Sequence, residues 1–241
     1  MEHLFDRTAL LVGEDAMSRI SNAKVIIFGI GGVGSWVAEC LVRTGIKDLT
    51  LVDSDRVSPT NVNRQMPATS HTIGEIKTEA AQKRLLEINP DADIKTITLF
   101  YDETTASEID LSEYDYIVDA IDSLKDKALL ILNATSSGRK FYSSMGAALK
   151  IDPRKIAIGE FWSVKGCPLA RALRQKFKKE KKYPARKFQC VYSDELLTNR
   201  GTPTGESCDY KARINGSLCH ITAIFGMTLA GMIVQDLTTT P

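Results

Sequence analysis

A run of glycines early in the chain has the spacing of a phosphate-binding turn. The run contains four glycines, Gly29, Gly31, Gly32 and Gly34. It follows the short apolar segment 24–28, and glycines there let the backbone approach a phosphate while the first turn of the next helix offers unpaired N–H groups. Asp53 ends the second apolar segment, where a carboxylate can accept hydrogen bonds from ribose hydroxyls. We expect this set to bind an adenosine nucleotide.

The sequence also contains polar residues that a phosphate-binding turn alone does not require. They are Asp55, Asn61, Arg64, Lys77 and Asp122. Asn61 and Arg64 lie about one turn apart on an expected short helix, so both can face one ligand, and Lys77 begins a helix where its ammonium can meet phosphate oxygens. Asp122 follows the fourth expected strand, at the sheet edge where ligands bind, and its carboxylate can hold Mg²⁺. The combination favours ATP, because a nicotinamide-dependent dehydrogenase leaves it unexplained.

The elements that must position these residues alternate between strand and helix. Apolar runs predict strands at 24–28, 49–52, 94–99, 116–120 and 140–144, and helical patterns predict helices at 33–45, 77–88, 123–137 and 218–237. This order predicts an α/β fold, a Rossmann-like doubly wound and mostly parallel sheet. We expect one domain over 1–241, with a nucleotide-binding core at 1–146 and an extension at 147–241 that is β-rich at 156–162 and carries mobile loops at 198–205.

Composition excludes several classes of protein. The 241 residues are 43% hydrophobic with a net charge of +1, as in an ordinary globular chain. Five cysteines without a CxxC pair argue against a structural zinc finger, and their odd number favours reduced thiols in the cytoplasm. The apolar segment 218–237 is interrupted by polar residues, which favours a buried core helix, with His220 in the core, over membrane insertion.

Together the motifs resemble the ubiquitin-activating-type (ThiF) adenylyltransferases, from about residue 5 to residue 146. The resemblance implies that the glycine turn binds ATP, that Asp53 binds ribose and that Asn61, Arg64 and Lys77 bind the triphosphate. It further implies that Asp122 binds Mg²⁺. Arg7, in RTALL, falls on the arginine that reaches across a homodimer to the partner's ATP, although Thr8 stands where glutamine is usual.

The second half of the chain resembles one branch of that family, the tRNA threonylcarbamoyladenosine dehydratases. The segments that carry this likeness are GAALKIDP at 146–153, PLAR at 168–171, CVYS at 190–193 and NGS at 215–217. The CxxC zinc pairs and the thioester-forming cysteine of protein-activating members are missing. The branch implies ATP-dependent cyclisation of a modified adenosine in tRNA through an acyl adenylate, with release of pyrophosphate and AMP.

Under this interpretation the basic segment 170–182 gains a role. Nine basic residues and one acid stand between positions 171 and 187. A flexible segment of this kind can neutralise tRNA phosphates, although a solvated helix face is the ordinary alternative. The candidate contacts are Arg171, Arg174, Lys178, Lys179 and Lys182.

Other interpretations stay open at this point. They are an adenylyltransferase that activates a ubiquitin-like or sulfur-carrier protein, and a non-catalytic nucleotide-dependent scaffold in sulfur trafficking. Cys190 is either a thiol near the site or a small apolar residue. A sulfur-acceptor or cysteine desulfurase system as a partner, and a monovalent cation beside the nucleotide, also stay open.

Overall fold

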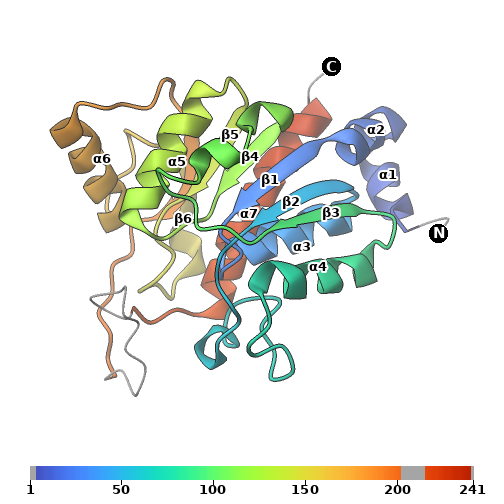
Figure 1. The fold of residues 1–241 in the computed structure, drawn as a ribbon, viewed down its shortest axis with the longest axis horizontal. Coiled ribbons are helices and arrows are strands. Elements are labelled where there is room, and N and C mark those ends of the chain that lie inside the picture. Colours follow the sequence, from blue (N-terminus) through green and yellow to red (C-terminus); the bar gives the residue numbers. More distant parts are fainter. Residues whose placement is uncertain (1–3, 202–214, 240–241) are drawn as a thin grey trace.

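The computed structural model describes residues 4–201 and 215–239, and its centre is a seven-stranded sheet with helices on both faces (Figure 1). The strands are β1 (Lys24–Phe28), β2 (Asp48–Val52), β3 (Asp93–Ile97), β4 (Tyr116–Asp119), β5 (Lys140–Ser144), β6 (Ile156–Glu160) and β7 (Gln189–Ser193). The helices are α1 (Asp6–Val12), α2 (Glu14–Asn22), α3 (Gly34–Thr44), α4 (Lys77–Ile88), α5 (Leu124–Ser136), α6 (Pro168–Glu180) and α7 (Cys219–Thr239). Short 3₁₀ turns lie at Pro59–Asn61, Ala106–Glu108, Leu111–Glu113 and Pro153–Lys155.

The strand order is β3-β2-β1-β4-β5-β7-β6, and every pairing except β6 with β7 is parallel. The order reverses between β1 and β4, because the chain first adds strands on one side of β1 and then on the other. Register pairs Phe28 with both Val52 and Asp119. The segments that follow β1, β2 and β4 therefore emerge side by side at one edge, where doubly wound folds bind ligands.

Two apolar layers cover the sheet. Alternate residues of β1 point to opposite faces, so Val25 and Ile27 pack toward α3 and α7 while Ile26 and Phe28 pack toward α5 and α6. All four are fully buried. This is why β1 reads as a continuous apolar run rather than an alternating one.

Helix α7 is the one helix within the described residues that is long and apolar enough to cross a membrane, and 56% of its most apolar window is buried. It packs against α3 and α2. Gly226 permits the close approach, because a Cβ there would lie 2.5 Å from the carbonyl oxygen of Val33. The structure therefore uses α7 as a core helix.

Two features of the second half differ from expectation. The basic segment is an ordered helix, α6, because Ala170, Leu173 and Phe177 recur at helical spacing and pack in the core beside α5. Strand β7 was not expected, and it inserts between β5 and β6. The expected loop at 198–205 lies outside the described residues from position 202 onward.

Candidate nucleotide and metal site

The glycine turn after β1 leaves no room for side chains at two of its positions. Gly29 has φ +87°, and a Cβ on it would lie 2.8 Å from the carbonyl oxygen of Ala120. A Cβ on Gly34 would lie 1.9 Å from the carbonyl oxygen of Gly29. The turn therefore folds tightly over the segment after β4. The start of α3 has no side-chain cap. The N–H groups of Ser35 and Trp36 donate to the carbonyls of Gly31 and Val33, and the positive end of the helix dipole remains suited to an anion.

Gly32 and Gly31 form the outer part of this turn. A Cβ on Gly32 would lie 3.2 Å from the side chain of Thr222 in α7 and 3.3 Å from Cγ of Arg64. Gly31 faces more open space, with Nε2 of Gln65 3.8 Å from a Cβ placed there. The glycine turn is thus flanked by the start of α7 and by the aliphatic part of the Arg64 side chain.

Asp53 ties the end of β2 to the glycine turn. One carboxylate oxygen accepts a hydrogen bond from the N–H of Ile30 at 2.6 Å, and the other accepts from the N–H of Asp55 at 2.8 Å. Burial raises the pKa of Asp53, and the charge of Lys77 opposes that rise. Each carboxylate oxygen has a further lone pair, so the group can also accept from a ribose hydroxyl.

Lys77 begins α4 and is held in place by the segment after β2. Its Nζ lies 2.8 Å from Oδ2 of Asp55, and its backbone N–H donates to the carbonyl of Asp55 at 3.0 Å. The lysine side chain is 6% exposed, whereas that of Asp55 is 66% exposed. A buried ammonium is therefore presented beside Asp53 with a solvated carboxylate as its partner.

Asn61 and Arg64 approach the same edge from the loop 58–65. Asn61 ends a 3₁₀ turn rather than sharing a longer helix with Arg64, and its Oδ1 accepts from the N–H of Ser58 at 3.1 Å. Nη1 of Arg64 donates to the carbonyl of Thr60 at 2.8 Å and to Oδ1 of Asn63 at 2.9 Å. Burial lowers the pKa of Arg64, and the nearby charge of Asp122 opposes this. Arg64 and Asp122 are therefore electrostatic neighbours.

A buried ion pair contacts the backbone just before Asp122, where Nζ of Lys127 donates to the carbonyl of Ile121 at 2.9 Å. Nζ of Lys127 is 2.7 Å from Oδ2 of Asp119, and both side chains are fully buried. Ser143 donates to the same carboxylate oxygen at 2.6 Å. Burial raises the pKa of Asp119, and Lys127 beside it opposes that rise. Sequence reasoning missed this cluster, although a lysine on the apolar face of α5 was a readable signal.

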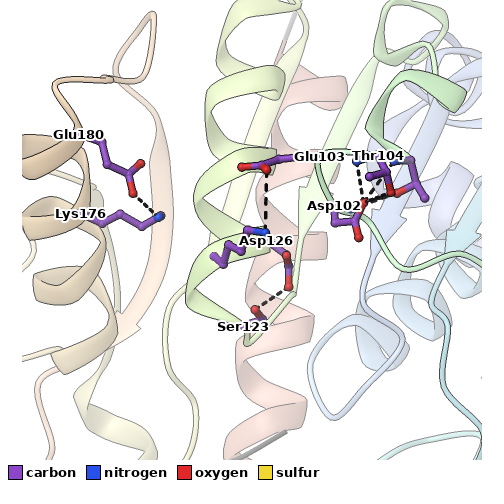
Figure 2. A network of polar contacts seen from close by, with 9 residues as sticks. Asp102, Glu103, Thr104, Ser123, Asp126, Lys176 and Glu180 are labelled. Carbon is purple, nitrogen blue, oxygen red and sulfur yellow. Dashed lines mark hydrogen bonds and ion pairs between the residues drawn. The ribbon is translucent and has the colours of Figure 1, made fainter.

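The first turn of α5 follows immediately and is fixed by its own polar contacts (Figure 2). Oγ of Ser123 donates to Oδ2 of Asp126 at 2.6 Å. Lys125 extends toward Glu103, with Nζ and Oε2 3.9 Å apart. The Ser123 contact thus fixes the start of α5 just after Asp122, whereas the exposed pair of Lys125 and Glu103 contributes little.

Arg7 lies apart from this cluster within one chain. Helix α1 is followed by α2, which ends just before β1 begins, at the sheet edge opposite the glycine turn. Arg7 is exposed, as are Leu10 and Leu11 on the same helix, at 89% and 85%.

Helix α6 and the segment just after it present most of the predicted tRNA contacts to solvent. Arg171, Lys178, Lys179 and Lys182 are exposed. Arg174 differs, because its Nη1 donates to the carbonyl of Phe161 at 2.9 Å and its guanidinium lies 5.8 Å from the centre of that ring. Lys176 forms an ion pair with Glu180 (Figure 2).

The cysteines and the histidine of the second half differ in exposure. Cys190 is fully buried, its thiol donates to the carbonyl of Gly159 at 3.4 Å, and burial raises its pKa to about 12. It therefore behaves as a small apolar residue. The expectation of a core histidine is wrong, because His220 is exposed, with Nε2 2.9 Å from the carbonyl oxygen of Ile151. Cys208 lies outside the described residues.

Comparisons with known proteins agree with this geometry. Residues 5–240 match the ThiF family. The chain is 35% identical to the tRNA threonylcarbamoyladenosine dehydratase of Haemophilus influenzae, over 98% of this chain and 94% of that one. It is 32% identical to the Bacillus subtilis protein of the same name, over 98% and 95%.

A solved structure gives the same result. Escherichia coli tRNA N6-threonylcarbamoyladenosine dehydratase in complex with ATP matches with a TM-score of 0.86 and 32% identity, covering 97% of this chain and 93% of that one. The sulfur carrier protein adenylyltransferase of Thermus thermophilus is 35% identical over only 49% of this chain. The expected doubly wound sheet is confirmed, and the chain belongs to the ThiF family.

Proposed function

We propose that this protein is an ATP-dependent tRNA threonylcarbamoyladenosine dehydratase. The observation that carries the proposal is one sheet edge that unites the glycine turn, Asp53, Lys77, Arg64 and Asp122 in a chain similar to such dehydratases over nearly its whole length. The ATP bound in the matching solved structure supports ATP as the nucleotide.

The proposed reaction has two steps. The threonyl carboxylate of the tRNA nucleoside attacks the α-phosphate of ATP, which forms an acyl adenylate and releases pyrophosphate. The neighbouring carbamoyl group then attacks the activated acyl carbon, AMP leaves, and a ring closes with loss of a proton. A carboxylate is already a nucleophile, so the protein needs no covalent side chain. Its contribution is to align the reactants and to neutralise the phosphates.

The residues of the site divide these tasks. The N–H groups of the glycine turn and of α3 would hold phosphate oxygens, and Asp53 would accept from the ribose. Asn61, Arg64 and Lys77 would face the triphosphate, where two cations stabilise the departing pyrophosphate. Asp55 would act mainly by holding Lys77, its partner at 2.8 Å.

Asp122 is suited to Mg²⁺. Within the described residues no group of three or more His, Cys, Asp or Glu side chains is placed to hold a metal ion. A lone carboxylate fits Mg²⁺, which protein sites commonly hold through one or two carboxylates together with substrate phosphates and water. Bound there, the ion would neutralise charge on the triphosphate.

We further propose that the enzyme is a cytoplasmic homodimer. Leu10 and Leu11 expose apolar side chains on α1 next to Arg7, and a second copy covering α1 would bury them. The partner's Arg7 would then reach the ATP of the first subunit. Helix α6 would contact tRNA phosphates through Arg171, Lys178 and Lys179, together with Lys182 just beyond its end.

One assay tests the proposal. The protein is mixed with Mg²⁺, ATP and tRNA carrying threonylcarbamoyladenosine, and the nucleoside is followed by mass spectrometry together with AMP and pyrophosphate. We expect ATP-dependent loss of one water from the nucleoside, abolished by Asp122→Ala. An unchanged nucleoside in the presence of bound ATP would contradict the proposal and turn the search to a carrier-protein substrate.

A further inference from the structure

The segment between β4 and α5 is unusual because both backbone polar groups of one residue, Ile121, are held by buried charged side chains. The N–H of Ile121 donates to Oδ1 of Asp119 at 3.1 Å. The carbonyl of Ile121 accepts from Nζ of Lys127 at 2.9 Å. Since that carbonyl belongs to the peptide that leads into Asp122, these contacts set the direction in which Asp122 leaves the sheet.

Lys127 and Asp119 are also positioned by one another. Both side chains of their 2.7 Å ion pair are fully buried, and the hydroxyl of Ser143 in β5 donates a further hydrogen bond to the carboxylate. A buried ion pair is seldom a source of net stability, because taking two charges out of water costs about as much as their attraction returns. The placement of this pair therefore calls for a role other than holding the core together.

The backbone of Ala120 and Ile121 also packs directly against the glycine turn. A Cβ on Gly29 would lie 2.8 Å from the carbonyl oxygen of Ala120 and 3.1 Å from the nitrogen of Ile121. On its other side Asp122 approaches Arg64, whose pKa reflects that charge. A small rotation of the Ile121 peptide would thus change the distance between Asp122 and the triphosphate.

We propose that Lys127 is a positioning residue, which holds the Ile121 peptide so that Asp122 meets the metal-bound triphosphate. The proposal rests on the proposed function only in taking Asp122 as the metal-binding carboxylate. It assigns Asp119 and Ser143 to orienting Lys127. Groups that orient a metal ligand typically change metal affinity by about 10- to 100-fold when removed.

Two variants separate an effect on the position of Asp122 from an effect on the stability of the fold. Lys127→Met removes the contact to the Ile121 carbonyl and leaves Asp119 as an unpaired buried charge. It should therefore both displace Asp122 and destabilise the fold. Asp119→Asn combined with Lys127→Met also removes that charge, while the amide oxygen still accepts from the N–H of Ile121. Lys125→Met is the matched control, because it removes a lysine from the same helix turn that is 65% exposed.

Melting temperature, affinity for AMP and affinity for ATP over a range of Mg²⁺ concentrations are measured for each. AMP is the reference because it lacks the β- and γ-phosphates. We expect Lys127→Met to melt lower and the double variant to recover much of that loss. In both variants ATP binding with Mg²⁺ should weaken by about tenfold while AMP binding changes by less than about twofold. Lys125→Met should match the unmodified protein in every measurement.

Two outcomes would overturn the proposal. One is a double variant that recovers both melting temperature and ATP affinity, because the pair would then serve the fold alone. The other is an equal loss of AMP and ATP affinity, which would show that the substitution disturbs the whole nucleotide site and not only the position of Asp122. Neither readout uses tRNA, so the result stands even where the dehydratase assay fails.

Discussion

Replacing Lys77 by methionine should separate nucleotide chemistry from folding. The ammonium is buried, yet its direct partner Asp55 is 66% exposed, so the variant leaves that partner carboxylate solvated. The net contribution of the pair is about 0 to 1 kcal/mol, because the cost of burying the ammonium offsets much of its attraction to a solvated carboxylate. Methionine also matches lysine in helix propensity and fills the stem volume. For a domain of this size, loss of the pair corresponds to a fall in melting temperature of about 4 °C or less.

The loss in catalysis should be larger. A hydrogen bond to a charged partner is worth about 1.5–3 kcal/mol, which is roughly 10- to 100-fold in kcat/KM for ATP. Loss of the lysine charge should also raise the pKa of Asp53 further, because Lys77 opposes the effect of burial there. The acid side of the pH–rate profile should therefore move to higher pH.

Asp55→Ala is the matched control, since it removes the other half of the same pair. It leaves the ammonium of Lys77, which is only 6% exposed, without this carboxylate. It should therefore destabilise the fold more than Lys77→Met does, as thermal unfolding would measure. If Lys77→Met lowers the melting temperature by more than about 10 °C, or keeps kcat/KM within about threefold, this reasoning is refuted.

Three other predictions follow from the structure. Gly34→Ala should abolish ATP binding and lower the melting temperature, because its Cβ would lie 1.9 Å from the carbonyl oxygen of Gly29; normal ATP affinity by calorimetry would contradict this. Cys190 has a pKa of about 12 in place of 9.0, so above about pH 9 the unfolded chain binds fewer protons and stability falls as pH rises. Cys190→Ala should flatten that fall in denaturant titrations and keep dehydratase activity at neutral pH; an identical pH dependence in the two proteins would refute it. Charge reversal at Arg171, Lys178 and Lys182 should weaken tRNA binding and reduce its salt dependence by a slope of about 2, whereas reversal of the exposed Lys47 should not; equal effects would return α6 to a solvated surface.

Local signals made much of this molecule predictable. The glycine turn, the strand that precedes it and Asp53 are specified by residues close together in sequence, and the structure places them as expected. Helix α4 likewise begins at Lys77 and ends at Ile88, before Asn89 and Pro90. Such features depend on backbone sterics and turn chemistry, which a short window of sequence records.

Features that depend on distant partners were not predictable in the same way. Strand β7 takes its place between β5 and β6 through pairing with segments far along the chain. Arg174 looked like a surface cation, but Phe161 engages it on the inner side of α6. His220 stands in an apolar run, yet it lies on the exposed side of α7. In each case tertiary packing decides what the local pattern leaves open.

The docking of α7 has a consequence for how the protein is made. The ribosome synthesises residues 219–239 after every strand of the sheet, yet α7 covers α3 and places Thr222 against Gly32. A nascent chain that stops short of α7 exposes the surfaces of α3, β5 and β7 that α7 contacts, and it lacks Thr222 beside Gly32. The glycine turn therefore acquires its final surroundings only after residues 219–239 have been synthesised, and until then the apolar surface that α7 later covers is a target for chaperones.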